Sequence, residues 1–340
     1  TNGKTTTTAL TGEIMKRHFD SVFVVGNIGE PYTAHALETE EDSVVVAEVS
    51  SFQLETIMEF HPNVSAITNI TPDHLDRHKT MEGYIQVKEG ITRNQTEKDS
   101  CVLNYDDPVL RAFGETLKCK VLYFSRQEKL ENGVFMDGDQ IVYRHDRKTE
   151  PILDVSELQI IGGHNHENVM TAAAIAIQMG VSLKEIREAC LAFKAVEHRI
   201  EFVRELDGVK YYNDSIASSP SRTIAGLHSF RQKLVLIAGG YDKKIPFDAL
   251  GPEICAHVRL LILCGATAEK IEAAVKSAPD YRPGQPEILH AQTLEEAVRL
   301  AKRHTVPGDI VTLSPACAAF DQFKNFMVRG ETYKTLVRAL

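Results

Sequence analysis

The sequence predicts an α/β fold in two domains, a central domain with a mainly parallel sheet and a smaller, doubly wound C-terminal domain. Short apolar segments alternate with helical stretches along the chain, which is typical of parallel βα units. A length of 340 residues is enough for about two domains of ordinary size. The pattern changes after Phe193, so we expect the domains to comprise residues 1–193 and 194–340.

The composition describes a globular protein and excludes several classes of function. Hydrophobic residues make up 43% and charged residues 25%, with no apolar run near the roughly 20 residues that a membrane span needs. A net charge of −9 argues against a nucleic-acid partner. The cysteines are scattered without metal spacing, which predicts reduced core residues and a cytoplasmic location: Cys101, Cys119, Cys190, Cys255, Cys264 and Cys317.

The first element carries a phosphate-binding pattern. Thr1-Asn2-Gly3-Lys4-Thr5-Thr6 matches the second half of the motif G-x-x-x-x-G-K-[ST], followed by a helix. Such a loop offers backbone N–H groups to phosphates, a lysine between the terminal phosphates and a hydroxyl for Mg²⁺. An ordinary helix start is the alternative. Because the first glycine of the motif would precede Thr1, we expect the chain to be truncated inside the loop.

Three strands follow, at residues 21–25, 44–47 and 66–70, and the second is expected to be buried. Each ends in polar residues: Asn27 follows the first, Glu48 ends the second, and Thr71-Pro-Asp-His-Leu-Asp-Arg-His follows the third. Ligands of open α/β sheets bind at the carboxyl ends of strands. These clusters are therefore the candidate site.

Glu48 is the candidate metal ligand, since an acidic residue ending a strand beside a phosphate loop holds Mg²⁺ in many nucleotide-binding proteins. A plain strand-end carboxylate is the alternative. His74 and His78 are either surface histidines or ligands, and we favour His74. Lys88 lies on a helix that begins near Thr80. It is either a solvated helix cation or, if carbamylated, a carboxylate-like metal ligand.

The rest of the first domain continues the alternation. Strands are expected at residues 99–104 and 120–124, and a polar β-hairpin excursion between Glu131 and Glu150. An alanine-rich helix over residues 169–180 follows Gly163-His-Asn-His-Glu-Asn. Asn165 and Asn168 share one helix face. Either Asn165 caps the helix, or both amides face a nucleotide.

The second domain begins with a hairpin of strands 200–206 and 209–213. Further strands are expected at residues 233–237, 260–264, 288–291 and 309–313, with helices between them. Gly239-Gly240 is a strand-end turn that lacks the full dinucleotide-binding glycine pattern.

The ordered motifs resemble those of the Mur ligase family. They are the phosphate loop, Glu48-Val-Ser-Ser-Phe-Gln-Leu-Glu, the His74 segment, Gly163-His-Asn-His-Glu-Asn, Glu197-His-Arg, Asn213-Asp-Ser and Leu313-Ser-Pro-Ala-Cys-Ala. The resemblance spans essentially the whole chain. It implies a central P-loop ATPase domain, a Rossmann-like ligase domain and a missing N-terminal domain that binds a uridine nucleotide. The Ser-Ser-Phe-Gln-Leu-Glu segment is similar to the branch that adds glutamate to UDP-N-acetylmuramoyl-L-alanine.

The resemblance also implies roles for individual residues. Lys4, Glu48, His74 and Lys88 would be catalytic, and Thr5, Glu48, His74 and carbamylated Lys88 would hold two Mg²⁺ ions. The ATP site would comprise Thr1, Asn2, Gly3, Lys4, Thr5, Thr6, Asn168, Arg199 and Asp214. The muramoyl substrate and glutamate would contact Asn27, Ser50, Ser51, Ser218, Lys243 and Phe326.

Three positions depart from the family pattern on the amino-acid side. Ile216 stands where many members have lysine, Ser218 where they have threonine, and Ala319 where they have serine. The identity and handedness of the added amino acid therefore stay open.

The resemblance implies ATP-driven amide formation through an acyl phosphate, by a monomer that acts on small-molecule substrates in peptidoglycan precursor synthesis. Two alternatives are a sister ligase for another amino acid or L-glutamate, and a ligase of the folylpolyglutamate type. A third alternative, from a different class, is a nucleotide-binding module that does not catalyse.

Overall fold

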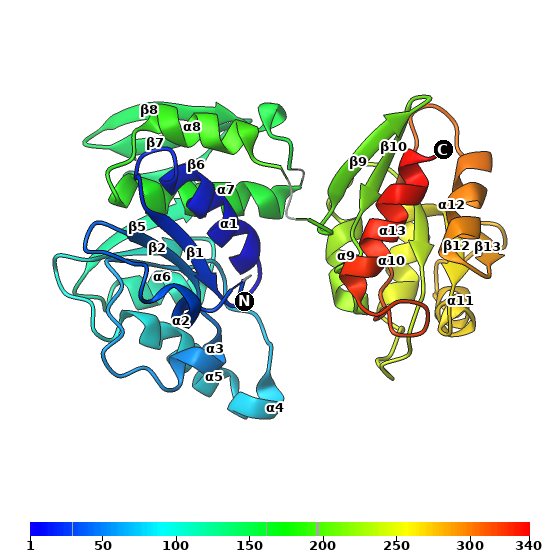
Figure 1. The fold of residues 1–340 in the computed structure, drawn as a ribbon, viewed down its shortest axis with the longest axis horizontal. Helices are drawn as coiled ribbons and strands as arrows, with labels where there is room; N and C mark the ends of the chain where they lie inside the picture. Colours follow the sequence, from blue (N-terminus) through cyan, green and yellow to red (C-terminus); the bar gives the residue numbers. More distant parts are fainter. Residues whose placement is uncertain (29, 161, 195–196) are drawn as a thin grey trace. The chain divides into compact units, whose positions relative to one another are not determined.

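The computed structural model describes residues 1–28, 30–160, 162–194 and 197–340. It divides into two compact units (Figure 1). The N-terminal unit comprises Thr1–Gln159 and Gly163–Phe193, and the C-terminal unit comprises Lys194–Leu340 with the short segment Ile160–Gly162. No helix in the described part of the chain is long and apolar enough to cross a membrane.

The N-terminal unit contains a two-stranded parallel sheet and a six-stranded sheet of order β3-β4-β5-β6-β7-β8. The strands are β1 (Val22–Gly26), β2 (Val44–Glu48), β3 (Val64–Ile67), β4 (Ser100–Asn104), β5 (Lys120–Ser125), β6 (Gly133–Asp137), β7 (Gln140–His145) and β8 (Lys148–Asp154). The helices are α1 (Lys4–Met15), α2 (Tyr32–His35), α3 (Ser51–Leu54), α4 (Leu75–His78), α5 (Met81–Glu89), α6 (Pro108–Gly114), α7 (Gly163–Gln178) and α8 (Leu183–Ala192), with 3-10 turns η1 (Gly90–Thr92) and η2 (Val155–Glu157).

Helices cover both faces of the six-stranded sheet. The long helix α7 packs on β3, β4, β5 and β6 and against α1. Tyr84 of α5 and Leu110 of α6 join Ile67, Cys101 and Leu103 of the strands in one buried cluster. Because α7 is rich in alanine, α1 can approach it closely, and this contact positions the loop before α1.

The hairpin predicted between Glu131 and Glu150 is present as β6 and β7, but it is part of the main sheet rather than a polar excursion. β6 pairs in parallel with β5, and β6, β7 and β8 then continue the same sheet as an antiparallel meander. Val134, Phe135 and Ile141 are fully buried. The apolar side chains of this segment therefore extend the core.

The prediction that the second strand is buried is wrong. Residues of β2 alternate between half-buried and exposed, and only Glu48 is buried. In the described part of the chain, β2 pairs with β1 alone. Its residues line a cavity together with residues of β3, so β2 lacks the neighbour that would bury it.

The C-terminal unit is a six-stranded sheet of order β13-β12-β11-β14-β10-β9, parallel except for the β9–β10 hairpin. Its strands are β9 (Glu201–Leu206), β10 (Val209–Asn213), β11 (Leu234–Ala238), β12 (Val258–Cys264), β13 (Glu287–Ala291) and β14 (Ile310–Leu313). Its helices are α9 (Pro220–Leu227), α10 (Leu250–His257), α11 (Ala268–Lys276), α12 (Leu294–Arg303) and α13 (Phe326–Arg338).

Side chains of β11 point alternately to the two faces of this sheet, and both faces are buried. Leu234, Leu236 and Ala238 join a cluster with α9, α10 and α11, whereas Val235 and Ile237 join one with α12 and α13. Helices on both faces of a mainly parallel sheet make a doubly wound fold. All six cysteines are free and buried, as predicted.

Candidate active site

The loop before α1 has the conformation that its glycine predicts. Gly3 has φ 84°, in the left-handed region that glycine tolerates best. A Cβ atom on Gly3 would lie 2.1 Å from Oδ1 of Asn168, so a larger residue would displace the amide of Asn168. The first turn of α1, with its free N–H groups, begins directly after this glycine.

Polar residues that follow β3 hold this loop in place. Asn69 Oδ1 accepts a hydrogen bond from the backbone N–H of Asn2 at 2.8 Å, and Thr68 Oγ1 donates to the Asn2 carbonyl at 2.7 Å. β3 ends at Ile67, earlier than its prediction, and Thr68 and Asn69 follow it. Lys4 Nζ donates to the carbonyl of Thr1 at 2.9 Å. Thr5 is half-buried, whereas Thr6 is buried and its hydroxyl has no partner in the described part of the chain.

Glu48 is a buried carboxylate with half of its hydrogen bonding satisfied. Its residue is 3% exposed, Oε1 accepts from Asn27 Nδ2 at 3.1 Å, and Oε2 has no partner among the described residues. Gly26 brings Asn27 within reach, because a Cβ atom there would lie 2.3 Å from the Glu48 carbonyl oxygen. Leaving a buried charged acceptor unpaired costs about 1–3 kcal/mol or more, so this oxygen favours a cation.

One cavity of about 750 Å³ brings four of the predicted residues together. Thr1, Lys4, Glu48 and Lys88 all line it. Lys88 comes from α5, which begins as expected after Thr80, whose hydroxyl accepts from the Gly83 N–H at 3.1 Å. The cavity thus contains two ammonium groups and one carboxylate.

Lys88 is not the solvated cation of the alternative interpretation. It is 7% exposed, and its Nζ lies 4.9 Å from the centroid of the Tyr84 ring. Burial, and secondarily the charge of Lys4, lower the pKa of Lys88 to about 8. A measurable fraction of Lys88 is therefore an uncharged amine near neutral pH.

The two histidines of the loop after β3 have different surroundings. The His74 side chain is 48% exposed and is not among the residues that line the cavity. Its ring and the ring of Phe52 are T-shaped to each other, with centroids 5.0 Å apart. The His78 side chain is 2% exposed and contacts Ser51 Oγ at 3.0 Å and Glu55 at 3.3 Å. The preference for His74 as a ligand stays a prediction, and the sequence pattern did not indicate the burial of His78.

The predicted substrate residues Ser50 and Ser51 begin α3. Ser50 and Gln53 form a capping box, in which each side chain bonds the backbone N–H of the other. The spacing Ser-x-x-Gln is the known signature of this motif, and it offers a structural reason for Ser50. Ser51 is buried against His78.

The two asparagines of α7 lie on one buried face, inside the helix rather than at its cap. Asn168 Nδ2 donates to Asn165 Oδ1 at 3.0 Å, and Asn168 Oδ1 accepts from Thr7 Oγ1 at 3.3 Å. Asn168 therefore joins α7 to α1 directly beside Gly3. In this conformation its side chain supports the phosphate-loop segment.

In the C-terminal unit, Asp214 lies in a fully buried position at the end of β10. Its carboxylate accepts from Ser314 Oγ at 2.7 Å and from the Ile200 N–H at 3.3 Å. Burial raises the pKa of Asp214 to about 7, although these hydrogen bonds and the charges of Arg199 and Arg222 act in the opposite direction. Arg199 is thus electrostatically coupled to Asp214.

Arg329 is a candidate that sequence reasoning missed. It is 3% exposed, and its guanidinium donates to Ser215 Oγ and to the carbonyls of Ser215, Cys317 and Ala318 at 2.9–3.1 Å. It joins the loop after β10 to the loop after β14. An arginine in an amphipathic helix gives no sequence signal of such burial.

The predicted amino-acid residues lie around these loops. Ser215 Oγ donates to the carbonyl of Phe326 at 2.8 Å, and Ser218 is half-buried two residues before α9. Lys243 is exposed, in a loop whose Tyr241 N–H donates to the Ala318 carbonyl at 2.9 Å. Ala319, where the family pattern has serine, is buried next to this contact.

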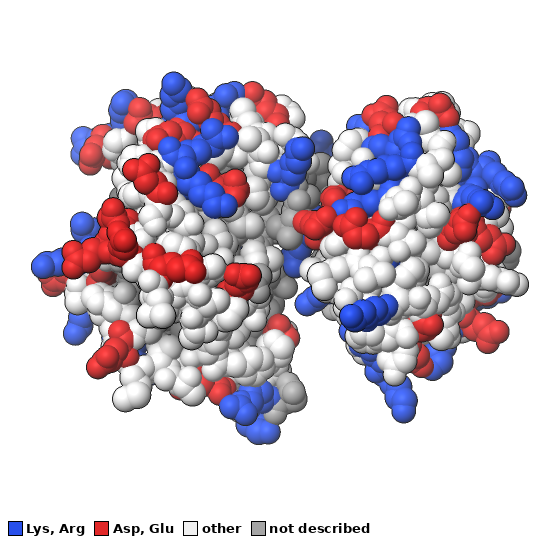
Figure 2. Space-filling view, in the orientation of Figure 1, with Lys and Arg blue, Asp and Glu red and all other residues white. Residues whose placement is uncertain are grey.

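The face drawn in Figure 2 carries basic and acidic side chains on both units, with broad areas of other residues between them. Basic and acidic side chains are interspersed on each unit. The cations that the candidate site uses are therefore individual, locally placed residues.

Comparison with known proteins identifies both units. Residues 1–176 match the Mur ligase middle domain, and residues 198–317 match the glutamate ligase domain of Mur ligases. The chain is 50% identical over 340 residues to a UDP-N-acetylmuramoylalanine--D-glutamate ligase of Lachnoclostridium phytofermentans, covering 100% of this chain and 74% of that protein. A ligase of the same name from Clostridioides difficile is 46% identical, with the same coverage.

Solved structures confirm the α/β fold. UDP-N-acetylmuramate-alanine ligase MurC of Thermotoga maritima aligns with a TM-score of 0.70 at 17% identity, covering 100% of this chain and 74% of the other. MurF ligase of Thermotoga maritima, solved in complex with ADP, aligns with a TM-score of 0.68 at 18% identity, covering 100% and 78%. At these identities the alignments establish the fold alone.

The raised pKa of Asp214 predicts a pH-dependent stability. The folded protein binds this proton more tightly than the unfolded chain. As the pH rises from about 4 to about 7, the carboxyl group ionises in the unfolded chain first, so the free energy of unfolding falls. Asp214→Asn stays uncharged. Its melting temperature relative to the unchanged protein should therefore be higher at about pH 8 than at about pH 5.

Asp242→Asn is the matched control, measured by the same thermal unfolding. Lys270 lowers the pKa of Asp242, so this carboxylate is ionised throughout that pH range and the difference should be constant. A constant difference for Asp214→Asn as well would contradict the assignment of a raised pKa to Asp214.

Proposed function

Since the chain belongs to the Mur ligase family, we propose that its two units bind ATP and the incoming amino acid in a UDP-N-acetylmuramoyl-L-alanine:D-glutamate ligase. The reaction is ATP-dependent addition of glutamate in peptidoglycan precursor synthesis. The observation that carries the site assignment is the shared cavity of Lys4, Glu48 and Lys88. These three charged groups come from three separate elements and line one cavity, which supports a site for charged ligands.

The chemistry requires that a carboxylate be made electrophilic. A carboxylate repels an attacking amine, and transfer of the γ-phosphoryl group of ATP gives an acyl phosphate with a good leaving group. The amine then attacks to form a tetrahedral intermediate, which collapses to the amide and releases phosphate. Lys4, at the start of α1, would balance the charge of the phosphates.

Mg²⁺ fits the residues present. The unpaired Oε2 of buried Glu48 is an oxygen ligand without a partner in the described part of the chain, and hard cations prefer such oxygens. Thr5, Glu48, His74 and carbamylated Lys88 would hold the metal, for which we expect two ions. When bound, Mg²⁺ would neutralise the charge that accumulates on the phosphoryl group.

The lowered pKa of Lys88 supports its proposed carbamylation. The uncharged amine adds to CO₂ through its nitrogen lone pair and loses one proton, which gives a carbamate with a negative charge. The same burial that lowers the pKa of Lys88 would protect the carbamate from solvent. The result would be an acidic group in the cavity that Lys4 also lines.

The C-terminal unit would complete the reaction. Arg199 and Asp214 would contact ATP, and Lys243, Ser218 and Phe326 the incoming glutamate. Asn27, Ser50 and Ser51 would position the muramoyl substrate. Arg329 would hold the loops of Ser215 and Ala318 at their present spacing.

The identity of the amino acid is supported by the names of the relatives, which are D-glutamate ligases. Ile216, Ser218 and Ala319 depart from the family pattern, so a sister ligase or one of the folylpolyglutamate type is the alternative within the family. Phosphate release by the full-length protein with a panel of amino acids separates them. We expect release with D-glutamate, whereas selective release with another amino acid would favour an alternative.

Lys4→Ala should lower the rate of ADP release about a hundredfold or more, because one transition-state charge contact is lost. The assay contains ATP, Mg²⁺, UDP-N-acetylmuramoyl-L-alanine and D-glutamate. Lys16→Ala is the control, since Lys16 is the exposed residue directly after α1 and its side chain pairs with Glu13. Turnover of Lys4→Ala at the unchanged rate, with an unchanged melting temperature, would remove Lys4 from the mechanism.

Lys88→Ala should lose activity that short carboxylic acids restore in part, because they replace the carbamate. The same acids should not restore Lys4→Ala, which lacks a cation. Carbon-13 labelled bicarbonate should give a carbamate resonance in the unchanged protein and none in Lys88→Ala. If the acids fail and the resonance is absent, Lys88 acts as an amine.

Ala319→Ser restores the hydroxyl of the family pattern beside the loop of Lys243. It should change the KM for D-glutamate more than the KM for ATP, because the new hydroxyl lies on the amino-acid side. Steady-state kinetics with each substrate varied in turn give both constants. Equal changes in both would place Ala319 away from the amino acid.

A further inference from the structure

A cluster of two histidines and one glutamate lies between α9 and α10 of the C-terminal unit. His228 directly follows α9 as its C-cap residue, and Glu253 and His257 lie one turn apart on α10. Glu253 Oε2 lies 2.6 Å from His228 Nε2 and 3.6 Å from His257 Nε2. The centroids of the two imidazole rings are 4.9 Å apart, and the three ligand atoms lie within 4.8 Å of one another.

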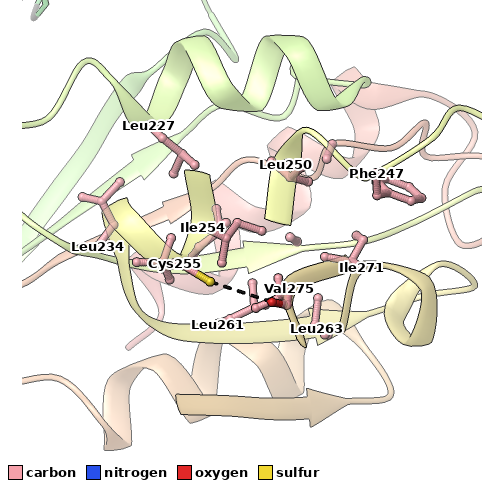
Figure 3. Close-up of a cluster of buried hydrophobic side chains, with 14 of the residues drawn as sticks. Leu227, Leu234, Phe247, Leu250, Ile254, Cys255, Leu261, Leu263, Ile271 and Val275 are labelled. Atoms are coloured by element: carbon pink, nitrogen blue, oxygen red, sulfur yellow. Dashed lines mark hydrogen bonds between the residues drawn. The ribbon is translucent and has the colours of Figure 1, made fainter. Parts of the chain in front are cut away.

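The backbone positions of these residues are fixed by the core beneath them. Leu227 precedes His228, Ile254 follows Glu253, and both are almost fully buried in one cluster with Leu250 (Figure 3). His257 is followed by Val258, the fully buried first residue of β12. Ligands on rigid elements need little rearrangement to bind a metal. Small side-chain rotations would close the three ligand atoms around one ion.

A second cluster in the same unit is neutralised by a lysine of the chain itself. Glu197, His198 and Glu331 also bring three ligand atoms together. There, however, Lys334 Nζ lies 2.5 Å from Glu197 and 2.6 Å from Glu331. That ammonium already occupies the position of a cation. Among the ion pairs of the described residues, Glu253 pairs only with the two histidines.

We propose that His228, Glu253 and His257 bind one Zn²⁺ ion, with water completing the coordination. Two imidazole nitrogens and a carboxylate are ligands that suit zinc, whereas Mg²⁺ prefers oxygen. The three residues belong to none of the motifs that we assign to ATP, Mg²⁺ or glutamate. The ion would join the end of α9 to the last turn of α10 and so stabilise the folded C-terminal unit.

The proposal is tested by isothermal titration calorimetry, in which Zn²⁺ is added to tag-free, full-length protein in the presence of excess Mg²⁺. The measurement gives the affinity for Zn²⁺ and the number of ions bound per chain. Co²⁺ in place of Zn²⁺ gives an absorption spectrum that reports its coordination. We expect one Zn²⁺ per chain in addition to any at the active site. His257→Gln should weaken this binding about tenfold or more, because a direct ligand is lost. Zn²⁺ should also raise the melting temperature of the unchanged protein and not that of His257→Gln.

Two further variants make the result decisive. Glu253→Gln, which keeps the shape of the side chain, should weaken binding as His257→Gln does. His290→Gln is the matched control, because His290 pairs with Glu272 at 2.7 Å in the same unit without a second histidine, and it should bind as the unchanged protein does. The proposed site would be overturned if all variants bound Zn²⁺ with equal affinity, or if His290→Gln lost Zn²⁺ binding.

Discussion

The N-terminal unit is arranged around a buried carboxylate that its own side chains only half satisfy. Glu48 has one oxygen bonded to Asn27 and one without a partner in the described part of the chain. Gly26 is needed for this arrangement, because no side chain fits between the turn after β1 and the Glu48 backbone. The sheet thus brings an acidic group, desolvated and incompletely paired, to the cavity of the phosphate-loop segment. A fold does not retain such an energetic cost for stability alone.

The C-terminal unit also buries charged side chains, an aspartate and an arginine, at separate positions. Asp214 is buried and accepts hydrogen bonds from a serine hydroxyl and a backbone N–H, and Arg329 is buried with carbonyl and hydroxyl oxygens as its acceptors. Burial raises the pKa of the former and lowers the pKa of the latter to about 10. The loops after β10 and β14 are joined by these buried polar contacts, so nearby functional groups would be positioned before any substrate binds.

Periodicity and glycine positions made the α/β fold predictable, because buried parallel strands and strand-end turns leave strong local signals. The sequence also predicted which elements supply Lys4, Glu48 and Lys88. What it could not predict depends on neighbours distant in the chain. β2 reads as a buried strand because Val44 to Ala47 are apolar, yet burial requires a second strand beside it. The burial of His78 and Arg329 depends on partners in other elements, namely Glu55 for the first and the loop after β14 for the second.

The charge balance of the cavity explains why a modification of one lysine would matter so much. With Lys88 protonated, Lys4 and Lys88 outweigh Glu48 and the three groups carry one net positive charge, which attracts phosphate but repels Mg²⁺. A carbamate on Lys88 would leave Lys4 as the cation against two acidic groups, so the net charge would become negative by one. The cavity would then attract the metal and still present Lys4 to the phosphates. The lowered pKa of Lys88 makes this reversal accessible near neutral pH, because the uncharged amine is the form that reacts with CO₂. Carbamylation of Lys88 would therefore reverse the sign of the net charge that Lys4, Glu48 and Lys88 present to the substrates.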